Sequence, residues 1–285
     1  MSLTQNPSRD NVKSLLDDFR LDEKIAIVTG AGRGIGRTIA LAFAEAGANV
    51  VVAARTIPEI EAVVNEVTAV GRKGLAVPTD VANSAQVDSL VQRTLDVFGK
   101  VDILVNNAGI YKELAVAPFP DKTITTPEVM RSSANRMTND EFNDVIETNV
   151  SGVFYGCRAV APHMMAQRSG KIINVSSIAA DQASVLESVY QASKAAVNMF
   201  TRCISLEWAP YNICVNGLAP GQYETPLTAH AWETQDRRDK MLAGIPLGRK
   251  GDMRNLGALA VYLASPASDY VTGQVMYVDG GITAK

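Results

Sequence analysis

The feature that most constrains the fold is a regular alternation of short apolar runs with longer amphipathic stretches. The short runs are rich in Val and Ile and apolar on both faces, which is typical of strands covered by helices on both sides. They occupy residues 24–30, 49–55, 74–80, 101–107, 170–177, 213–220 and 274–281. Helical patterns lie at 35–46, 57–71, 84–98, 140–168, 188–209 and 252–264. This order predicts an α/β protein, a single-domain Rossmann fold whose doubly wound, parallel, seven-stranded sheet carries helices on both faces.

The rest of the chain favours one domain over several. Its 285 residues, 47% of them hydrophobic, supply enough material for one large core. No linker rich in Gly, Ser or Pro divides the chain, and no repeat is found. We therefore predict one domain over residues 22–285, preceded by an N-terminal extension over 1–21. Two long segments, 111–139 and 222–250, follow the carboxyl ends of predicted strands, where ligands bind in open α/β sheets.

Composition and charge exclude several classes of partner. The net charge of −3 does not indicate a nucleic-acid footprint. No apolar run approaches the roughly 18 residues that a membrane span needs, and no basic-then-apolar signal opens the chain. Cys157, Cys203 and Cys214 are widely spaced and form no CxxC pair. We therefore expect reduced thiols, no metal site and a cytoplasmic location.

A glycine-rich loop, "TGAGRGIGR" (29–37), connects the first strand to the first helix. Gly30 permits the tight turn, Gly34 allows the backbone to approach a pyrophosphate, and Gly36 allows the helix to pack close to the strand. The helix N-terminus adds N–H donors and the positive end of its dipole. In this context the loop predicts a dinucleotide-binding site.

The end of the second strand indicates which dinucleotide binds. An Asp or Glu there would favour a free ribose 2′-hydroxyl, but this strand ends "VVAART", with Arg55 and Thr56 and no acid. Arg55 can meet a 2′-phosphate, and Arg33 can approach it from the glycine loop. The alternative is that both arginines are merely solvated. The pattern predicts NADP(H) in preference to NAD(H).

Tyr190 and Lys194 lie four residues apart in "ESVYQASKAAV" (187–197), and on a helix they would share one face. Taken alone, this pair is equally compatible with a solvated helix face. The rest of the chain decides between the two interpretations.

Together the motifs resemble the short-chain dehydrogenases/reductases, in the branch marked by T-G-x-x-x-G-x-G. The resemblance spans roughly residues 22–283. It rests on "TGAGRGIG" (29–36), "DV" (80–81), "NNAG" (106–109), Asn149 in "ETNVSG", Ser177 in "NVSS", "YQASK" (190–194), "PG" (220–221) with Thr225, and "VDGG" near the end.

The resemblance implies an NADP(H)-dependent enzyme that transfers hydride between nicotinamide C4 and a ketone or secondary alcohol. It implies a catalytic set of Asn149, Ser177, Tyr190 and Lys194, in which the spacing to Tyr190 selects Ser177 over Ser176. Cofactor contacts are implied at Gly30, Gly32, Arg33, Gly34, Ile35, Gly36, Arg55, Thr56, Asp80, Val81, Asn107, Tyr190, Lys194, Pro220, Gly221, Tyr223 and Thr225. Asp80 and Val81 would contact the adenine, and Tyr223 and Thr225 would bracket the nicotinamide carboxamide.

A lysine beside the tyrosine has a predictable electrostatic effect. At an effective dielectric near 20, an ammonium about 4 Å away would lower a tyrosine pKa by about three units. We therefore expect Lys194 to bring the pKa of Tyr190 close to neutrality, where a general acid/base works best. Asn149 would anchor a water that links Lys194 to solvent.

The sequence leaves the substrate open. The pattern is similar to gluconate 5-dehydrogenases and nearly as similar to 3-oxoacyl-[acyl-carrier-protein] reductases. The second class would need a basic docking patch, for which the candidates are Arg131, Arg136, Arg168, Lys171 and Arg202. A third interpretation is a non-catalytic protein that senses NADP(H), which the complete catalytic set disfavours. Candidate pocket residues are Tyr111, Gln182, Glu187, Gln222, Tyr223, Trp232 and Met241.

The resemblance also implies roles for the two long segments and a quaternary structure. The segment at 111–139 is longer than is usual in the family, and it is a specificity element, a subunit contact or a plain surface insertion. The segment at 222–250 corresponds to the family's substrate lid. The helices at 140–168 and 188–209 correspond to those that pair subunits, so we expect a homotetramer.

Overall fold

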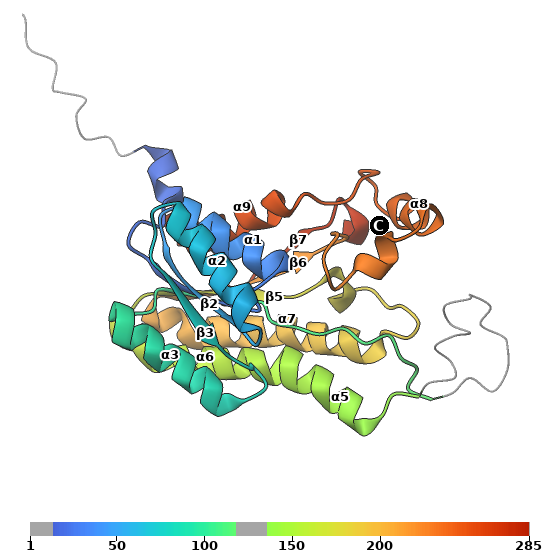
Figure 1. Cartoon of the computed structure of the whole chain (residues 1–285), viewed down its shortest axis with the longest axis horizontal. Helices are drawn as coiled ribbons and strands as arrows, with labels where there is room; N and C mark the ends of the chain where they lie inside the picture. The colour runs from blue at the N-terminus through green and yellow to red at the C-terminus, as the bar shows by residue number, and fades with distance from the viewer. Residues whose placement is uncertain (1–13, 118–135, 285) are drawn as a thin grey trace, which may run out of the picture.

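The computed structural model describes residues 14–117 and 136–284, and it confirms the predicted sheet. Seven strands run parallel in the order β3-β2-β1-β4-β5-β6-β7 (Figure 1). Their bounds are Ile25–Thr29 (β1), Asn49–Ala54 (β2), Gly74–Pro78 (β3), Ile103–Asn106 (β4), Gly170–Val175 (β5), Ile213–Pro220 (β6) and Val275–Val278 (β7). The order reverses between β1 and β4, which creates a crevice at the carboxyl ends of the strands.

Helices cover both faces of the sheet. One layer holds α1 (Gly34–Glu45), α2 (Ile57–Ala69) and α9 (Met253–Ala264), and the other holds α3 (Ser84–Phe98), α6 (Gly152–Gln167) and α7 (Ser188–Trp208) (Figure 1). Ala26 and Val28 of β1 pack into the first layer, while Ile27 packs into the second. Strand side chains alternate between faces, so a strand covered on both sides must be apolar throughout, as the sequence is.

The helix predicted over 140–168 is interrupted. It consists of α5 (Asn139–Ile146), a π-helical turn (η2, Glu147–Ser151) and α6. Thr138 and Glu141 form a capping box that begins α5. The π-turn holds Asn149, which is fully buried. Such turns are frequent at functional sites, but they leave the apolar periodicity on either side nearly intact, which is why the sequence did not reveal this one.

The ends of the segment 111–139 are held together beside α7. Met137 donates a backbone hydrogen bond to Ala115 O over 2.9 Å, and Leu114 donates one to Leu186 O over 3.0 Å. Residues 118–135, with Arg131 among them, lie outside the described residues. The second long segment, 222–250, follows β6 and is partly helical, with η5 (Ala229–Trp232) and α8 (Gln235–Ala243).

The N-terminal extension, of which residues 1–13 lie outside the described residues, packs on the domain where it is described. A 3-10 turn (η1, Leu15–Phe19) places the Phe19 ring 6.1 Å from the Tyr262 ring, centroid to centroid. Leu21 is fully buried and donates its backbone N–H to Ala46 O over 2.8 Å. No helix in the described ranges is long and apolar enough to cross a membrane.

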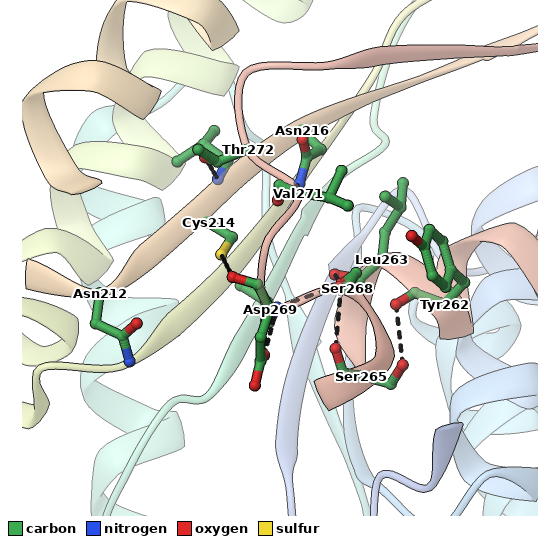
Figure 2. A network of polar contacts seen from close by, with 12 residues as sticks. Asn212, Cys214, Asn216, Tyr262, Leu263, Ser265, Ser268, Asp269, Val271 and Thr272 are labelled. Carbon is green, nitrogen blue, oxygen red and sulfur yellow. Dashed lines mark hydrogen bonds and ion pairs between the residues drawn. The ribbon is translucent and has the colours of Figure 1, made fainter. Parts of the chain in front are cut away.

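A network of polar contacts ties the last strand to the sheet at the end opposite the crevice (Figure 2). After α9, the turn η6 (Pro266–Ser268) places Asp269 next to Cys214, whose thiol donates to the Asp269 carbonyl over 3.6 Å. Asn216 Nδ2 donates to Val271 O over 2.8 Å, and Thr272 Oγ1 accepts from Val215 N over 3.0 Å. These bonds fix the start of β7 against β6.

Candidate active site

A cavity of about 830 Å³ opens at the carboxyl ends of β1, β2, β4, β5 and β6. Of the residues predicted to be catalytic or to contact the cofactor, only Gly36 and Asn149 do not line this cavity. The residues that do line it are Gly30, Gly32, Arg33, Gly34, Ile35, Arg55, Thr56, Asp80, Val81, Asn107, Ser177, Tyr190, Lys194, Pro220, Gly221, Tyr223 and Thr225. Residues from positions nearly 200 apart in the chain therefore meet in one place, as a doubly wound sheet requires.

The glycine loop forms a tight cradle at one end of the cavity. Gly30 has φ +62°, a left-handed conformation that favours glycine. A Cβ on Gly36 would lie 2.4 Å from both Gly30 O and Asn107 Nδ2. Asn107 Nδ2 in turn donates to Thr29 O over 2.9 Å and to Gly30 O over 3.2 Å. Gly36 and Asn107 thus shape the loop from behind, and Asn107 also lines the cavity.

We predict that Gly36→Ala lowers the free energy of unfolding by about 1–3 kcal/mol, because the new methyl group overpacks against two fixed polar atoms. Urea unfolding measures this change. Gly244→Ala is the matched control, since a Cβ at Gly244 would lie 3.3 Å from its nearest neighbour, Met241 O. Equal losses of unfolding free energy in the two variants would contradict the close packing of Gly36 against Gly30 and Asn107.

Charges of both signs gather beside the glycine loop. Arg33, the residue before α1, places Nη1 3.5 Å from Glu59 Oε1, and the Arg33 side chain is 69% exposed. Arg55 and Thr56 line the same part of the cavity, as does Glu59. Sequence reasoning missed Glu59, although its place in the first turn of the helix after β2 is a usable signal, since that turn faces the crevice.

Tyr190, Ser177 and Lys194 lie together at the other end of the cavity. Lys194 is 5% exposed and its ammonium donates to Val175 O over 2.9 Å, 5.8 Å from the centroid of the Tyr190 ring. Ser177 hydrogen-bonds to Tyr190. Ser176 is buried and its hydroxyl donates to the Lys194 carbonyl over 3.4 Å. The geometry therefore pairs Ser177, not Ser176, with the phenol.

The expected depression of the Tyr190 pKa is wrong, because the pKa is raised. Burial raises the pKa of Tyr190, the hydrogen bond from Ser177 lowers it, and the nearby Glu187 carboxylate raises it further. Burial also lowers the pKa of Lys194, from 10.5 to about 8. Desolvation disfavours both charged forms, and the ammonium is directed to Val175 O, so its attraction for a phenolate does not prevail.

Asn149 lies behind this group and does not line the cavity. Its Nδ2 donates to Ile110 O over 2.9 Å and to Ser193 Oγ over 3.0 Å, and its Oδ1 accepts from Ile110 N over 2.8 Å. A Cβ on Gly109 would lie 3.3 Å from Asn149 Oδ1 and 3.5 Å from Lys194 Nζ. Asn149 thus holds the backbone of the loop after β4 against α7 and next to Lys194.

Tyr223, at the start of the lid segment, lines the cavity together with Thr225. The Tyr223 side chain is 3% exposed, its hydroxyl donates to Val278 O over 3.1 Å, and its ring packs in the core. Its phenol oxygen is therefore engaged within the protein. Trp232 is also buried and does not line the cavity.

Six of the seven predicted pocket residues line the cavity: Tyr111, Gln182, Glu187, Gln222, Tyr223 and Met241. The Tyr111 hydroxyl donates to Glu187 Oε1 over 3.0 Å. Glu113, Arg237 and Lys240 line it as well and were not anticipated. The pocket therefore carries charges of both signs.

Two members of the candidate basic patch, Arg168 and Lys171, lie away from the cavity. Lys171 stands at the start of β5, at the opposite edge of the sheet from the cavity, and pairs with Asp269 over 2.9 Å. Arg168 lies just before it and donates to Pro210 O over 2.8 Å. Arg131 lies outside the described residues. Within the described part of the chain, no group of His, Cys, Asp and Glu could hold a metal ion.

Comparison with known proteins agrees with this arrangement. A family model described as "Enoyl-(Acyl carrier protein) reductase" matches residues 30–283. The chain is 38% identical to a 2-dehydro-3-deoxy-D-gluconate 5-dehydrogenase of Dickeya dadantii, over 95% of this chain and 100% of the relative. It is 39% identical to a 3-oxoacyl-[acyl-carrier-protein] reductase of Staphylococcus epidermidis, over 91% and 98%.

A solved structure supports the same conclusion. A gluconate 5-dehydrogenase from Burkholderia cenocepacia, determined in complex with NADP and tartrate, superimposes with a TM-score of 0.85 at 37% identity, over 95% of this chain and 100% of that one. Similarity therefore extends through the glycine loop, the Ser177–Tyr190–Lys194 group and the lid. The chain belongs to the short-chain dehydrogenase/reductase family.

Proposed function

We propose that the protein is an NADP(H)-dependent oxidoreductase, a carbonyl reductase and secondary alcohol dehydrogenase in which Tyr190 is the general acid/base. One observation carries the proposal: Tyr190, Ser177 and Lys194 meet at one end of a cavity whose other end is the glycine loop. The relatives support it, since they are named as dehydrogenases and reductases, and the Burkholderia structure contains NADP.

The lining of the cavity suits a dinucleotide that carries a 2′-phosphate. The glycine loop and the N-terminus of α1 would offer backbone N–H groups and a positive dipole end to the pyrophosphate. Arg33, Arg55 and Thr56 line the cavity and would supply cations and a hydroxyl for the 2′-phosphate. The lining residues Asp80 and Val81 would face the adenine, and Pro220, Gly221 and Thr225 the nicotinamide. When bound, the reduced nicotinamide supplies a hydride for a carbonyl carbon.

The side chains at the nicotinamide end handle the proton. Because its pKa is raised, the Tyr190 phenol keeps its proton at neutral pH and can donate it to the carbonyl oxygen as negative charge develops there. The Ser177 hydroxyl orients that oxygen and stabilises the charge. Lys194, whose pKa of about 8 leaves it mostly protonated at neutral pH, completes the positive environment.

The proposal is tested by following NADPH absorbance with the purified protein and a panel of polar ketoacids, cyclic ketones, aryl ketones and diketones. We expect oxidation of NADPH by at least one of these ketones. Complete silence across the panel, with NADPH bound, would contradict a carbonyl reductase. It would instead support a protein that binds NADP(H) to sense it.

A second candidate, 3-oxoacyl-[acyl-carrier-protein] reductase, is favoured by the 39% identity to the Staphylococcus enzyme. Acetoacetyl thioesters in the same panel separate the two. The positions of Arg168 and Lys171 at the far edge of the sheet do not support a carrier-docking patch built from them. Preferred reduction of the thioester would nevertheless replace the first candidate by this one.

Cofactor selectivity should respond in opposite directions to two substitutions. Arg55→Ala is expected to weaken NADPH binding about tenfold, since it removes a cation from the 2′-phosphate site. Glu59→Gln is expected to strengthen NADPH binding severalfold, because it releases Arg33 and removes a negative charge. NADH binding should change little in either. Dissociation constants from NADPH and NADH fluorescence titrations measure this.

Arg37→Ala is the matched control for that prediction. Arg37 also lies on α1, and it pairs with Glu66 of α2 outside the cavity. Its loss should leave both dissociation constants unchanged. Equal weakening of NADPH and NADH binding by Arg55→Ala would refute a 2′-phosphate site here, and so would equal kcat/KM values of the wild type with the two cofactors.

We also propose a homotetramer located in the cytoplasm. Apolar side chains are exposed on α6 and α7, with Phe154 46%, Met199 56% and Leu206 77% exposed, and a subunit interface would bury them. The free thiols of Cys157, Cys203 and Cys214 suit a reducing compartment. Light scattering on the purified protein measures the assembly directly.

We also propose that the chain is divided into an N-terminal extension (1–21) and a catalytic domain (22–285), with a substrate lid at 222–250.

A further inference from the structure

Glu187 is placed in the active-site cavity by a strained backbone. It is the last residue before α7, three positions ahead of Tyr190. Leu186 before it has φ +69°, a left-handed conformation that costs a non-glycine residue free energy. Leu186 is nonetheless buried, and its carbonyl accepts from Leu114 N over 3.0 Å. The surrounding contacts therefore enforce the turn that directs Glu187 toward the cavity.

The Glu187 carboxylate has few partners for a half-buried charge. Oε1 accepts from the Tyr111 hydroxyl over 3.0 Å, and Oε2 accepts from Gln191 Nε2 over a long 3.4 Å. Within residues 14–117 and 136–284, no cation pairs with it. Burial raises the pKa of Glu187, which reflects its poor solvation. A ligand that brings an O–H or N–H donor would supply the missing hydrogen bond.

This carboxylate lies beside the reacting phenol. The Tyr111 ring meets the Tyr190 ring edge-on, at 5.1 Å between centroids and 88° between planes. Tyr111, Glu187 and Tyr190 line the same cavity. A group attached next to the carbonyl of a substrate bound at Tyr190 would therefore lie close to Glu187.

The charges of the cavity are unevenly distributed. Glu113 adds a second negative charge near Tyr111 and Glu187, and its field raises the pKa of both. Arg237 and Lys240 line the cavity from the lid helix α8, on the other side. On the lid side each cation is paired with an acid, Arg237 with Glu233 over 3.6 Å and Lys240 with Asp236 over 2.8 Å. The α7 side, where no cation of the described residues pairs with Glu187, is thus acidic, and like charges repel strongly in a half-buried site.

We infer that Glu187, held by Tyr111, is a specificity-determining residue that selects a ketone carrying a hydroxyl group on the carbon next to the carbonyl and rejects a carboxylate at that position. The inference rests on the proposed function and narrows it to hydroxyketones and their polyol products.

Three ketones of one skeleton test this inference: α-hydroxyacetophenone, propiophenone and benzoylformate, which carry CH₂OH, CH₂CH₃ and COO⁻ on the carbonyl. With NADPH, the wild type should rank them in that order by kcat/KM. Glu187→Gln keeps the shape and one acceptor oxygen but removes the charge. It should raise the ratio of kcat/KM for benzoylformate to kcat/KM for propiophenone about tenfold or more, through the KM of benzoylformate. The ratio cancels the change in the Tyr190 pKa that the loss of the Glu187 charge brings to every substrate.

Glu187→Met removes the acceptor as well. It should also abolish the preference for the hydroxyl over the ethyl group, worth about tenfold for a hydrogen bond to a charged acceptor. Asp181→Asn is the matched control, since Asp181 is a nearby acid that bonds to Tyr277 and does not line the cavity. It should change none of the ratios. Should Glu187→Met fail to fold, Glu187→Gln alone decides.

A binding measurement separates this inference from the proposed function. The dissociation constant of benzoylformate for the NADPH-loaded protein should fall about tenfold in Glu187→Gln. If the wild type turns over no ketone, the proposed function fails, and the binding constants still report on Glu187. The inference is overturned if the wild type is active but both Glu187 variants share its values for two quantities. These are the dissociation constant and kcat/KM of benzoylformate, and the preference in kcat/KM for the hydroxyl over the ethyl group.

Discussion

Tyr190→Phe is expected to reduce kcat for ketone reduction by a factor between about 10² and 10⁴, the usual contribution of a general acid. The phenyl ring keeps the packing against Tyr111, whose ring contacts Tyr190 edge-on. What disappears is the proton donor and the hydrogen bond with Ser177. The NADPH dissociation constant should stay within about threefold, because the hydroxyl acts on the substrate oxygen. Steady-state kinetics and NADPH titration together measure the two effects.

Tyr155→Phe is the control for this prediction. Tyr155 lies on α6, where its ring is 5.5 Å from the Arg158 guanidinium, and it does not line the cavity. Its hydroxyl should be dispensable for turnover. A Tyr190→Phe enzyme with the kcat of the wild type would remove Tyr190 from the mechanism. A parallel loss in Tyr155→Phe would indicate a structural effect instead.

Lys194→Met should abolish turnover and yet stabilise the protein at neutral pH. The Lys194 ammonium is 5% exposed, and burial lowers its pKa from 10.5 to about 8. Keeping it charged in the fold therefore costs about 3 kcal/mol relative to the unfolded chain. Methionine removes this cost but leaves Val175 O without its donor, a loss of about 1–2 kcal/mol. We expect a net gain of about 1–2 kcal/mol at pH 7.

The pH dependence of that gain has a definite sign. Because the folded-state pKa is lowered, the unfolded chain binds more protons between pH 8 and 10.5, and wild-type stability rises over this interval. The destabilisation by Lys194 is thus fully present below about pH 8 and is gone above 10.5. The advantage of Lys194→Met should shrink through this window and reverse beyond it, where only the lost hydrogen bond remains.

Urea unfolding of both proteins across this pH range tests the prediction. Lys171→Met is a useful comparison, because Lys171 is paired with Asp269 at the other edge of the sheet, outside the cavity. A difference between Lys194→Met and the wild type that does not vary with pH would show that the ammonium is not desolvated in the fold.

Much of the architecture follows from local sequence. Strands apolar on both faces, such as β2, can exist only between two helical layers, so the alternation predicts the doubly wound sheet and its seven strands. The glycine loop between β1 and α1 predicts the cavity, because Gly30 and Gly36 occupy positions that side chains cannot. Four-residue spacing on one helix predicts that Tyr190 and Lys194 share a face.

Other features depend on elements that are distant in the chain. The π-turn that buries Asn149 is stabilised by the backbone of Ile110, 39 residues earlier. Glu59 faces Arg33 only because α2 packs beside α1. The Tyr223 hydroxyl bonds to Val278 O, which a motif-based assignment of its role could not foresee.

The active site shows most clearly the difference between what local sequence predicts and what depends on distant elements. Motifs and their spacing predict which residues meet: a tyrosine above a lysine on one helix, a serine at the end of β5 and a glycine loop at the end of β1. How these residues titrate depends on the packed fold, because burial is a property of the assembled layers and not of spacing. Desolvation of Tyr190 and Lys194 outweighs their mutual attraction, so the phenol holds its proton instead of losing it.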